Sequence, residues 1–392
     1  MQKTLLKQFG RRIRLGIVGG GLDSVIGSTH LAAMRVDGFC ELVAGAMSVD
    51  PDVARASAEA ELLDPDRSYT DYREMAEREA LRQDGIDAVV IATPPHVHFP
   101  VARAFLARGI DVVCEKPMTR DLGEALKLVD QVRATGRLFC LTHCYTGYPM
   151  VRQARAMIAA GALGAVRLID VEFAAGDKGV VAESDDPTRR HWHFKAGVMG
   201  KGVLLGEVGS HAHHLASYLT GLQATEVAAD LTTVAARREV YDNAYLTVRF
   251  EQGVRGRLWS SFVAAGNNHG LAFRVFGDEG ALLWHQESPE VLVHQRVGQP
   301  SVQLTRGLDS LSEASLRATR FRPGHPEGYA LAFANLYRDF AQAVMARSLG
   351  LPYDPYVAEL PGVAEGARGM KFIEAAMASH ERGGAWTDVW RD

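Results

Sequence analysis

Residues 14–21 read Arg14-Leu15-Gly16-Ile17-Val18-Gly19-Gly20-Gly21, an apolar run that ends in three consecutive glycines. The run is typical of a buried β-strand, and a glycine at its end permits a tight turn into a helix. Gly19 would make that turn, and Gly21 would let a pyrophosphate approach the backbone at the positive end of the helix. The stretch therefore predicts the first strand and turn of a dinucleotide-binding fold.

The turn departs from the usual dinucleotide-binding pattern at its third glycine. That position holds Ser24, and the next glycine is Gly27, so the loop is about three residues longer than usual. We expect the loop residues Ser24 and Ile26 to belong to the cofactor site. A glycine-rich turn without a ligand is the alternative, but a turn at the end of the first strand favours a nucleotide.

Strand-like and helix-like segments alternate through the first part of the chain. The expected strands are 14–18, 41–47, 86–92, 111–114 and 138–142, and the expected helices are 28–36, 53–62, 101–108 and 122–134. This alternation favours βαβ units and a parallel sheet. After about residue 148 strands predominate, with hairpins around residues 251–253 and 278–280.

The fold class is therefore α/β, with two domains. We predict a Rossmann domain that binds NAD(P) over residues 1–147 and an α+β domain over residues 148–392. The second domain should carry a large, mostly antiparallel, open sheet. Its last helices, 329–347 and 362–379, are expected to pack back on the first domain.

Composition excludes several classes of function. The formal net charge of −4 over 392 residues, without any basic run, argues against nucleic acid or an anionic membrane surface as a partner. No apolar stretch approaches the length of a transmembrane helix, and the N-terminus lacks the apolar segment of a signal peptide. Most of the four cysteines lie in or beside apolar runs, which suits buried thiols in the cytoplasm.

The choice between NAD and NADP depends on the end of the second strand. An acidic residue there would bind the ribose hydroxyls of NAD, but Met47 or Ser48 occupies that position. Asp50 follows two residues later and could instead cap the helix that begins near Pro51. Ser48 with Arg55 could accept the 2′-phosphate of NADP, so both cofactors stay open.

Two motifs carry candidate chemistry. Glu115-Lys116-Pro117 follows a strand-like run, and Glu207 precedes His211 by four residues. On a helix, Glu207 and His211 would share a face. His211 has a suitable ordinary pKa to accept a hydroxyl proton near neutral pH, while the Lys116 ammonium would stabilise a developing alkoxide. Lys116 as the base is the alternative assignment.

Zinc chemistry is a further alternative. Glu207, His211 and His214 could lie on one helical face, and His213, His191 and His193 lie nearby in the sequence. Because hydride chemistry with a lysine present requires no metal, we expect none in the site.

These motifs together resemble the Gfo/Idh/MocA family, which includes glucose–fructose oxidoreductase and inositol 2-dehydrogenase. The resemblance covers almost the whole chain and rests on Gly19–Gly21, Ala92-Thr93-Pro94 with His98, Glu115–Pro117, residues 206–211, and the final segment 369–386. It implies a Rossmann domain followed by a domain whose open sheet face forms the oligomer, and nicotinamide-dependent chemistry on a sugar or polyol.

The resemblance also implies roles for particular residues. Thr93, Pro94 and His98 would line the cofactor, and Glu115 and Lys116 would close the site between the domains. The Lys-Pro bond is often cis in such enzymes. The chain departs from the family where Glu207 replaces the usual Asp, and where His214 replaces a second Asp.

Substrate contacts should come from the cleft between the domains. We expect Lys116, Glu207 and His211 to bind the substrate. The other candidates are Tyr145, Tyr148, Trp192, His193 and His214. Ordinary packing is the alternative for the aromatic residues.

We therefore predict a cytoplasmic NAD(P)-dependent dehydrogenase that acts on a ring secondary hydroxyl of a sugar, glycoside or inositol. We expect a homo-oligomer, either a dimer or a tetramer, formed through the open sheet face. One alternative is a non-catalytic protein that senses a dinucleotide or a sugar. The other is an enzyme that recycles a tightly bound NAD.

Overall fold

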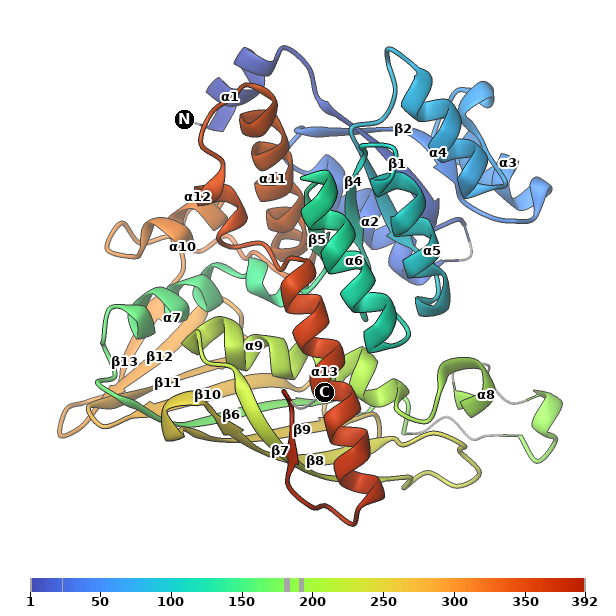
Figure 1. Ribbon diagram of the computed structural model, residues 1–392. Helices are drawn as coiled ribbons and strands as arrows, with labels where there is room; N and C mark the ends of the chain where they lie inside the picture. The colour runs from blue at the N-terminus through green and yellow to red at the C-terminus, as the bar shows by residue number, and fades with distance from the viewer. Residues whose placement is uncertain (1, 23, 180–183, 190–193, 391–392) are drawn as a thin grey trace. The chain divides into compact units, whose positions relative to one another are not determined.

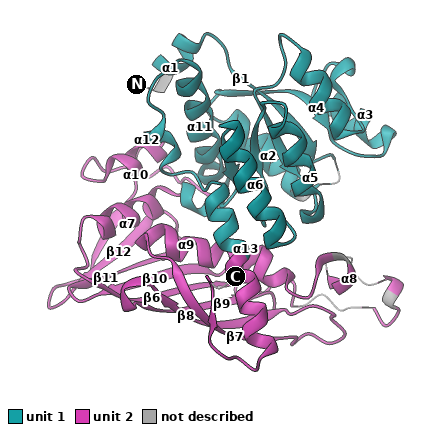
Figure 2. Ribbon diagram, viewed as in Figure 1, with its two compact units in different colours: residues 1–147, 329–370 teal, residues 148–328, 371–392 magenta. Residues whose placement is uncertain are grey.

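The computed structural model describes residues 2–22, 24–179, 184–189 and 194–390. The chain forms two compact units, which Figure 2 shows in different colours. Unit 1 contains Met1–Gly147 and Tyr329–Met370, and unit 2 contains Tyr148–Gly328 and Lys371–Asp392. The chain thus leaves unit 1 after Gly147, returns to it at Tyr329 and ends in unit 2.

Unit 1 is built on a parallel sheet. Its strands pair in the order β2-β1-β3-β4-β5, every pair parallel, which confirms the predicted α/β architecture. The strands are β1 Ile13–Gly19, β2 Cys40–Ala46, β3 Ala88–Ala92, β4 Asp111–Cys114 and β5 Phe139–Leu141. The chain moves from β1 to β2 on one side and later to β3 on the other. The strand order therefore reverses beside β1, where ligands bind in such sheets.

Helical segments precede, separate and follow the strands of unit 1 along the chain (Figure 1). They are α1 Gln2–Phe9, α2 Val25–Arg35, α3 Pro51–Ala60, η1 Pro65–Arg67, α4 Tyr72–Leu81, α5 Pro95–Leu106, α6 Leu122–Thr135, η2 Cys144–Gly147, α11 Tyr329–Ser348 and α12 Asp354–Val357. Ser24, Asp50 and Asp121 cap α2, α3 and α6 by accepting backbone N–H groups. Helix α13 Val363–Glu381 begins in unit 1 and ends in unit 2.

Helix α5 corrects one predicted boundary. It starts at Pro95 and not at Val101, because proline is tolerated in the first turn of a helix, where its missing N–H would have no partner. The earlier start adds His98, which is fully buried, to the helix.

Helix α11 is part of unit 1 although it lies about two hundred residues after β5 in the sequence. The Asn335 side-chain amide donates to the Gly147 carbonyl over 2.8 Å. Arg347 binds the buried Asp111 carboxylate at the start of β4, with one contact of 3.0 Å. These bonds attach α11 to η2 and to the sheet of unit 1.

Unit 2 contains a nine-stranded sheet in the order β13-β12-β11-β10-β6-β9-β8-β7-β14. The strands are β6 Val166–Ala174, β7 Ala224–Thr232, β8 Asn243–Phe250, β9 Arg255–Ser261, β10 Leu271–Gly277, β11 Gly280–His285, β12 Val291–Arg296, β13 Val302–Thr305 and β14 Thr387–Asp388. Among the described strands of this sheet, only the pair β6–β9 is parallel. The predicted, mostly antiparallel sheet is confirmed, and both predicted hairpins are present as β8–β9 and β10–β11.

The two faces of this sheet differ in burial. Helices α7 Pro149–Ala159 and α9 Ser210–Thr220 pack against strands of the sheet, as Figure 1 shows. The remaining helical segments of unit 2 are η3 Pro187–Arg189, α8 Ala196–Met199, η5 Leu205–Gly209, η6 Glu251–Gly253 and α10 Glu313–Ala318. Ile169, Val171 and Phe173 of β6 are buried, whereas Leu168, which points to the opposite face, is 52% exposed.

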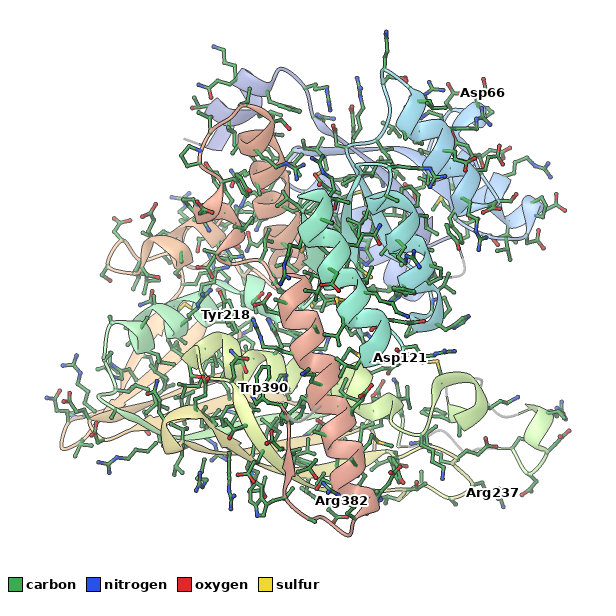
Figure 3. All side chains as sticks on the ribbon, in the orientation of Figure 1. Asp66, Asp121, Tyr218, Arg237, Arg382 and Trp390 are labelled. Carbon is green, nitrogen blue, oxygen red and sulfur yellow. The ribbon has the colours of Figure 1, made fainter. Side chains whose placement is uncertain are left out.

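The C-terminal segment is fixed to the edge of this sheet. The Trp390 indole N–H, labelled in Figure 3, donates to the Ala224 carbonyl over 2.8 Å, and β14 pairs with β7. In the part of the chain that the structure describes, no helix is both long and apolar enough to cross a membrane.

Candidate active site

The glycine turn has the backbone that a dinucleotide requires. Gly19 and Gly20 have φ of 76° and 72°, a region that L-residues rarely adopt. A Cβ on Gly19 would lie 2.6 Å from the Ala92 carbonyl oxygen, and a Cβ on Gly27 would lie 2.5 Å from the Gly20 Cα. Gly27 therefore allows the close approach of α2 to the turn that the third glycine of the usual fingerprint provides.

The loop between the turn and α2 is held by its own side chains. The Ser24 hydroxyl accepts the Gly27 N–H over 3.1 Å, and the Leu22 N–H donates to the Ser57 hydroxyl of α3 over 3.2 Å. Ser24 thus acts as a helix cap in this structure, and Ile26 is partly exposed on the first turn of α2. Whether either residue contacts a cofactor stays a prediction.

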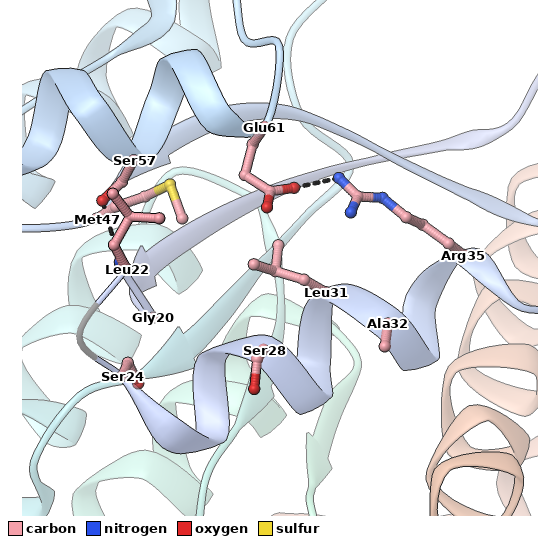
Figure 4. Close-up of a pocket in the computed structure, with 11 residues that line it drawn as sticks. Gly20, Leu22, Ser24, Ser28, Leu31, Ala32, Arg35, Met47, Ser57 and Glu61 are labelled. Carbon is pink, nitrogen blue, oxygen red and sulfur yellow. Dashed lines mark hydrogen bonds and ion pairs between the residues drawn. The ribbon is translucent and has the colours of Figure 1, made fainter.

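A pocket of about 290 Å³ lies beside the glycine turn (Figure 4). Its wall includes Gly20, Gly21 and Met47, and the Arg35 guanidinium forms an ion pair with the Glu61 carboxylate at one side. Glycines in the left-handed region, a close glycine contact and the N-terminus of α2 fit a pyrophosphate, and the adjacent pocket offers space beside it. The residues present therefore fit a nicotinamide dinucleotide.

Asp50 caps α3 at the end of β2. Its carboxylate accepts the Asp52 N–H over 2.9 Å and the Val53 N–H over 3.3 Å, and the Asp50 N–H donates to the Ser48 hydroxyl. This is the capping role that the sequence left open. Arg55 forms an ion pair with Asp52, so it is already partnered.

His98 connects the two loops that follow β3 and β4. Its ring nitrogens lie 2.8 Å from the Thr93 carbonyl oxygen and 2.8 Å from the Pro117 carbonyl oxygen. Burial lowers the pKa of His98, although both carbonyl oxygens oppose this effect. The ring thus fixes Thr93, Pro94 and the Lys116–Pro117 segment relative to one another, and its contact with a cofactor stays a prediction.

Glu115 and Lys116 lie at the carboxyl end of β4, where the Lys116–Pro117 bond is cis. The Glu115 carboxylate is buried; it lies 3.1 Å from His30 Nε2, and it accepts the Lys116 N–H and the Thr142 hydroxyl. Burial acts to raise the pKa of Glu115, but His30, the Lys116 charge and Thr142 outweigh it and hold the pKa below its usual value. Glu115 is therefore a carboxylate.

The Lys116 side chain is partly exposed. Among the described residues its ammonium has no hydrogen-bond or ion-pair partner, since only its backbone N–H is bonded. An ammonium in this position, beside a buried carboxylate and at the carboxyl end of a parallel strand, can bind a ligand oxygen.

Glu207 and His211 lie on consecutive helical segments of unit 2. Residues Leu205–Gly209 form a π-helical turn, which α9 continues from Ser210. The segment is helical, which was the condition for the pair to share a face, but its first turn is wider than an α-helix, so the α-helical i, i+4 alignment of the pair does not apply there. Such π-turns occur frequently at functional sites.

Lys178 is a site candidate that the sequence did not single out. Its ammonium lies 3.0 Å from Glu207 Oε2 and 4.1 Å from the centre of the Phe262 ring. Lys178 follows β6 in a polar stretch, and no spacing rule connects it with Glu207. The contact gives the Glu207 carboxylate a fixed counter-charge.

The histidines of α9 are buried among aromatic rings. The His211 ring lies 6.0 Å from the Phe173 ring, His213 stacks on Phe372 at 4.2 Å, and His214 stacks beside Tyr218. Across the described residues, no group of three His, Cys, Asp or Glu side chains is arranged to hold a metal.

The remaining substrate candidates divide into three cases. Tyr145 is buried in η2 and contacts the Tyr329 ring at 6.3 Å. Tyr148 is buried in unit 2, where its hydroxyl accepts the Gln286 amide over 3.1 Å and its ring packs on Trp284. This is the packing alternative stated for the aromatic residues. Trp192 and His193 lie outside the described residues.

The parallel sheet, the glycine turn and the lysine at a strand end define a two-domain, dinucleotide-binding oxidoreductase. The chain belongs to the Gfo/Idh/MocA family. Residues 13–143 match the model described as "Oxidoreductase family, NAD-binding Rossmann fold", and residues 151–283 match the family's C-terminal domain.

Solved structures match almost the whole chain. An oxidoreductase from Sinorhizobium meliloti is 43% identical with a TM-score of 0.85, and the match covers 96% of this chain and 99% of that one. An inositol dehydrogenase homologue from Azotobacter vinelandii, complexed with NAD⁺, is 37% identical with a TM-score of 0.90, covering 97% and 98%. A complex described as an inositol dehydrogenase homologue with NADH and myo-inositol, from the same organism, is 36% identical with a TM-score of 0.87, covering 97% and 98%.

Proposed function

We propose that this protein is an NAD-dependent dehydrogenase that oxidises a ring secondary hydroxyl of an inositol, sugar or glycoside. The observation that carries the proposal is the Lys116 ammonium, which lies beside the buried Glu115 carboxylate without a bonded partner among the described residues. Membership of the family and the 36% identical homologue complexed with NADH and myo-inositol support the substrate class.

Several residues of unit 1 would hold the dinucleotide. The turn at Gly19 and Gly21 and the N-terminus of α2 would bind the pyrophosphate, and Ser48 with Asp50 would lie near the adenosine ribose. The bound nicotinamide ring supplies a hydride acceptor. Thr93 and Pro94, held by His98, would border that ring.

NAD is the better fit of the two cofactors. Two arginines of this region already have acidic partners: Arg55, which follows β2, pairs with Asp52, and Arg35, which lines the pocket, pairs with Glu61. Asp50 adds further negative charge there. A 2′-phosphate would therefore meet paired guanidiniums and carboxylates, which disfavours NADP.

The reacting hydroxyl would be handled by three side chains. His211 accepts the hydroxyl proton, and Lys116 donates a hydrogen bond to the same oxygen and stabilises its developing charge. Glu207, with its counter-charge on Lys178, binds a neighbouring hydroxyl. Ring alcohols suit such a site because adjacent hydroxyls offer several polar contacts.

Absorbance of the reduced nicotinamide tests the proposal directly. Purified protein is mixed with NAD⁺ or NADP⁺ and a panel of inositols, aldoses and glycosides. The expected result is reduced cofactor that accumulates with one cyclic polyol or sugar, faster with NAD⁺. If calorimetry shows cofactor binding but no compound of the panel gives reduced cofactor, a dehydrogenase that releases its product is contradicted. A sensor or an internally recycled cofactor would then be favoured.

A further inference from the structure

A buried chain of polar groups connects α11 with the catalytic strand end inside unit 1. The Tyr337 hydroxyl lies 2.6 Å from His30 Nδ1, and His30 Nε2 lies 3.1 Å from Glu115 Oε1. Thr142, which follows β5, donates to the same carboxylate oxygen. All four side chains are buried, so these bonds form without competition from bulk water.

The direction of each hydrogen bond follows from the chemistry of the two ends. Glu115 is a carboxylate and can only accept, so His30 Nε2 must carry the proton that it donates. In a neutral imidazole the other nitrogen, Nδ1, is then an acceptor. Burial raises the pKa of Tyr337 well above its usual value, so this hydroxyl keeps its proton and can donate to Nδ1.

Only one placement of the protons gives every polar atom of these hydrogen-bonded side chains a partner. Among the described residues, His30 is the only polar partner of the Tyr337 hydroxyl. If His30 carried protons on both nitrogens, the tyrosine would have to accept from Nδ1, and its own proton would have no acceptor in the part of the chain described. Tyr337 therefore donates a hydrogen bond to His30, and His30 donates one to Glu115.

We propose that His30 and Tyr337 are positioning residues for the reaction: Tyr337 fixes the tautomer of His30, and His30 fixes the Glu115 carboxylate behind Lys116. The catalytic consequence rests on the proposed function, but the tautomer does not. Because Glu115 Oε2 also accepts the Lys116 N–H, movement of this carboxylate changes the backbone that carries the reacting ammonium. His30 is on α2, which starts at the glycine turn, so the same helix would hold both the cofactor and the carboxylate.

A structural role alone would make different predictions. A buried polar chain that only filled the core could be replaced without a change in turnover per folded molecule. The side chains offer graded variants. Tyr337→Phe removes one hydroxyl, His30→Gln keeps an N–H donor that can reach Glu115, and His30→Leu removes the donor.

Nitrogen-15 NMR of histidine-labelled protein tests the tautomer without any substrate. The His30 signals are assigned by their absence in His30→Gln. The expected wild-type result at pH 7 is a protonated Nε2 and an unprotonated, hydrogen-bonded Nδ1, and Tyr337→Phe should shift the Nδ1 resonance while Nε2 stays protonated. A proton on Nδ1 in the wild type, or an unchanged Nδ1 resonance in Tyr337→Phe, would overturn the proposal.

Kinetics test the positioning role once a substrate is known. We expect His30→Leu to lower kcat by about 10- to 100-fold, with the KM for NAD changed by less than about twofold, and His30→Gln to recover most of the loss. Tyr337→Phe should lower kcat by about fivefold. Tyr72→Phe is the matched control, because this partly exposed hydroxyl of unit 1 has no hydrogen bond within the described residues and its loss should change nothing.

The two experiments separate failure of the proposal from failure of the proposed function. If no substrate is found, the NMR result still decides the tautomer. Equal kcat in folded His30→Leu, His30→Gln and wild type would refute the positioning role while the dehydrogenase assignment stands. Near-ultraviolet circular dichroism of each variant establishes whether it is folded. If His30→Leu does not fold, Tyr337→Phe and His30→Gln still test the positioning role.

Discussion

At the scale of single residues, the relation between the charges of Glu115 and Lys116 is the main feature of unit 1. Its carboxylate neighbour Glu115 is buried and bonded on both oxygens, while the lysine side chain is partly exposed and lacks a bonded partner among the described residues. A structural ion pair would be expected to bring the two side chains into direct contact. The arrangement instead leaves the ammonium available to a ligand oxygen.

Lys116→Ala should therefore lower turnover by about 100-fold or more, because an alkoxide in the transition state loses its charged donor. The Kd for NAD should stay within about threefold, since the glycine turn is untouched. Initial rates and calorimetry measure the two effects. Lys127→Ala, on the exposed side of α6, is the control, and unchanged turnover in Lys116→Ala would remove this lysine from the mechanism.

Lys178 has a second testable role at this scale. Lys178→Met should raise the KM for the sugar or polyol by about tenfold, because Glu207 loses its counter-charge and its fixed direction. The KM for NAD should not change. Steady-state kinetics in both substrates check this, and an unchanged substrate KM would mean that Glu207 is held in place without Lys178.

At the scale of elements, the contact between the glycine turn and α2 explains the unusual spacing of the motif. The loop before α2 is longer than usual, yet Gly27 still meets Gly20 backbone to backbone. The pattern of glycines differs from the fingerprint, whereas the packing requirement behind the third glycine is kept. The requirement belongs to the helix–turn contact and not to a fixed position in the sequence.

Gly27→Ala should destabilise unit 1 by about 1–3 kcal/mol, because the added methyl overlaps the Gly20 backbone. Displacement of the turn should also weaken NAD binding by about tenfold or more. Thermal unfolding and calorimetry measure both. Gly369→Ala in α13, where a Cβ meets nothing within 4 Å, should instead stabilise by about 0.5–1 kcal/mol, and equal effects of the two variants would contradict the packing argument.

The contribution of His98 to the stability of the fold should depend on pH. Burial lowers the pKa of His98 from its usual 6.5, so its contribution to stability is present above pH 6.5 and is lost as pH falls through the lower, folded-state value. Glu115, with a pKa below its usual 4.5, loses its contribution only at still lower pH. Because partial burial also lowers the pKa of His269, part of the effect below pH 6.5 belongs to unit 2.

We therefore expect the unfolding temperature to fall between pH 7.5 and pH 5.5, and to fall less in His98→Asn than in the wild type. Differential scanning calorimetry across this range measures the difference. His96→Asn, at an exposed position two residues earlier on α5, is the control. If the unfolding temperature depends on pH in the same way in the wild type and in His98→Asn, His98 does not gain a proton when the protein unfolds.

At the scale of the whole molecule, the open face of the nine-stranded sheet is the surface to explain. The strand register places Leu168, Tyr245, Trp259, Arg257 and Arg274 on that face. Leu168 is 52% and Tyr245 is 51% exposed, and the Tyr245 ring stacks on Trp259. Exposed apolar and aromatic side chains on an open sheet face are typical of an interface. We propose that this face forms a homo-oligomer.

Tyr245→Glu should shift the mass in light scattering toward the monomer, because a carboxylate would be buried without a partner in the interface. Leu81→Glu is the matched control, since Leu81 is 88% exposed on α4 of unit 1. A monomeric wild-type protein, or an unchanged mass in Tyr245→Glu, would contradict the proposed interface.

Much of this molecule was predictable because its signals are local. The parallel strands follow from apolar runs such as Ala88–Ala92, the turn from Gly19, and the candidate chemistry from the strand end at Lys116 and the pair Glu207 and His211. Each of these depends on a residue and its near neighbours in the chain. The family resemblance added the cis bond before Pro117, which the structure contains.

Only the tertiary structure decided which distant residues meet. Nothing in the spacing relates His30 to Tyr337, which lie 307 residues apart, or Lys178 to Glu207, because hydrogen bonds between side chains depend on packing and not on position in the chain. Likewise, only the fold shows that Asp50 caps α3 and that Tyr148 is buried, because burial and backbone geometry are properties of the folded molecule.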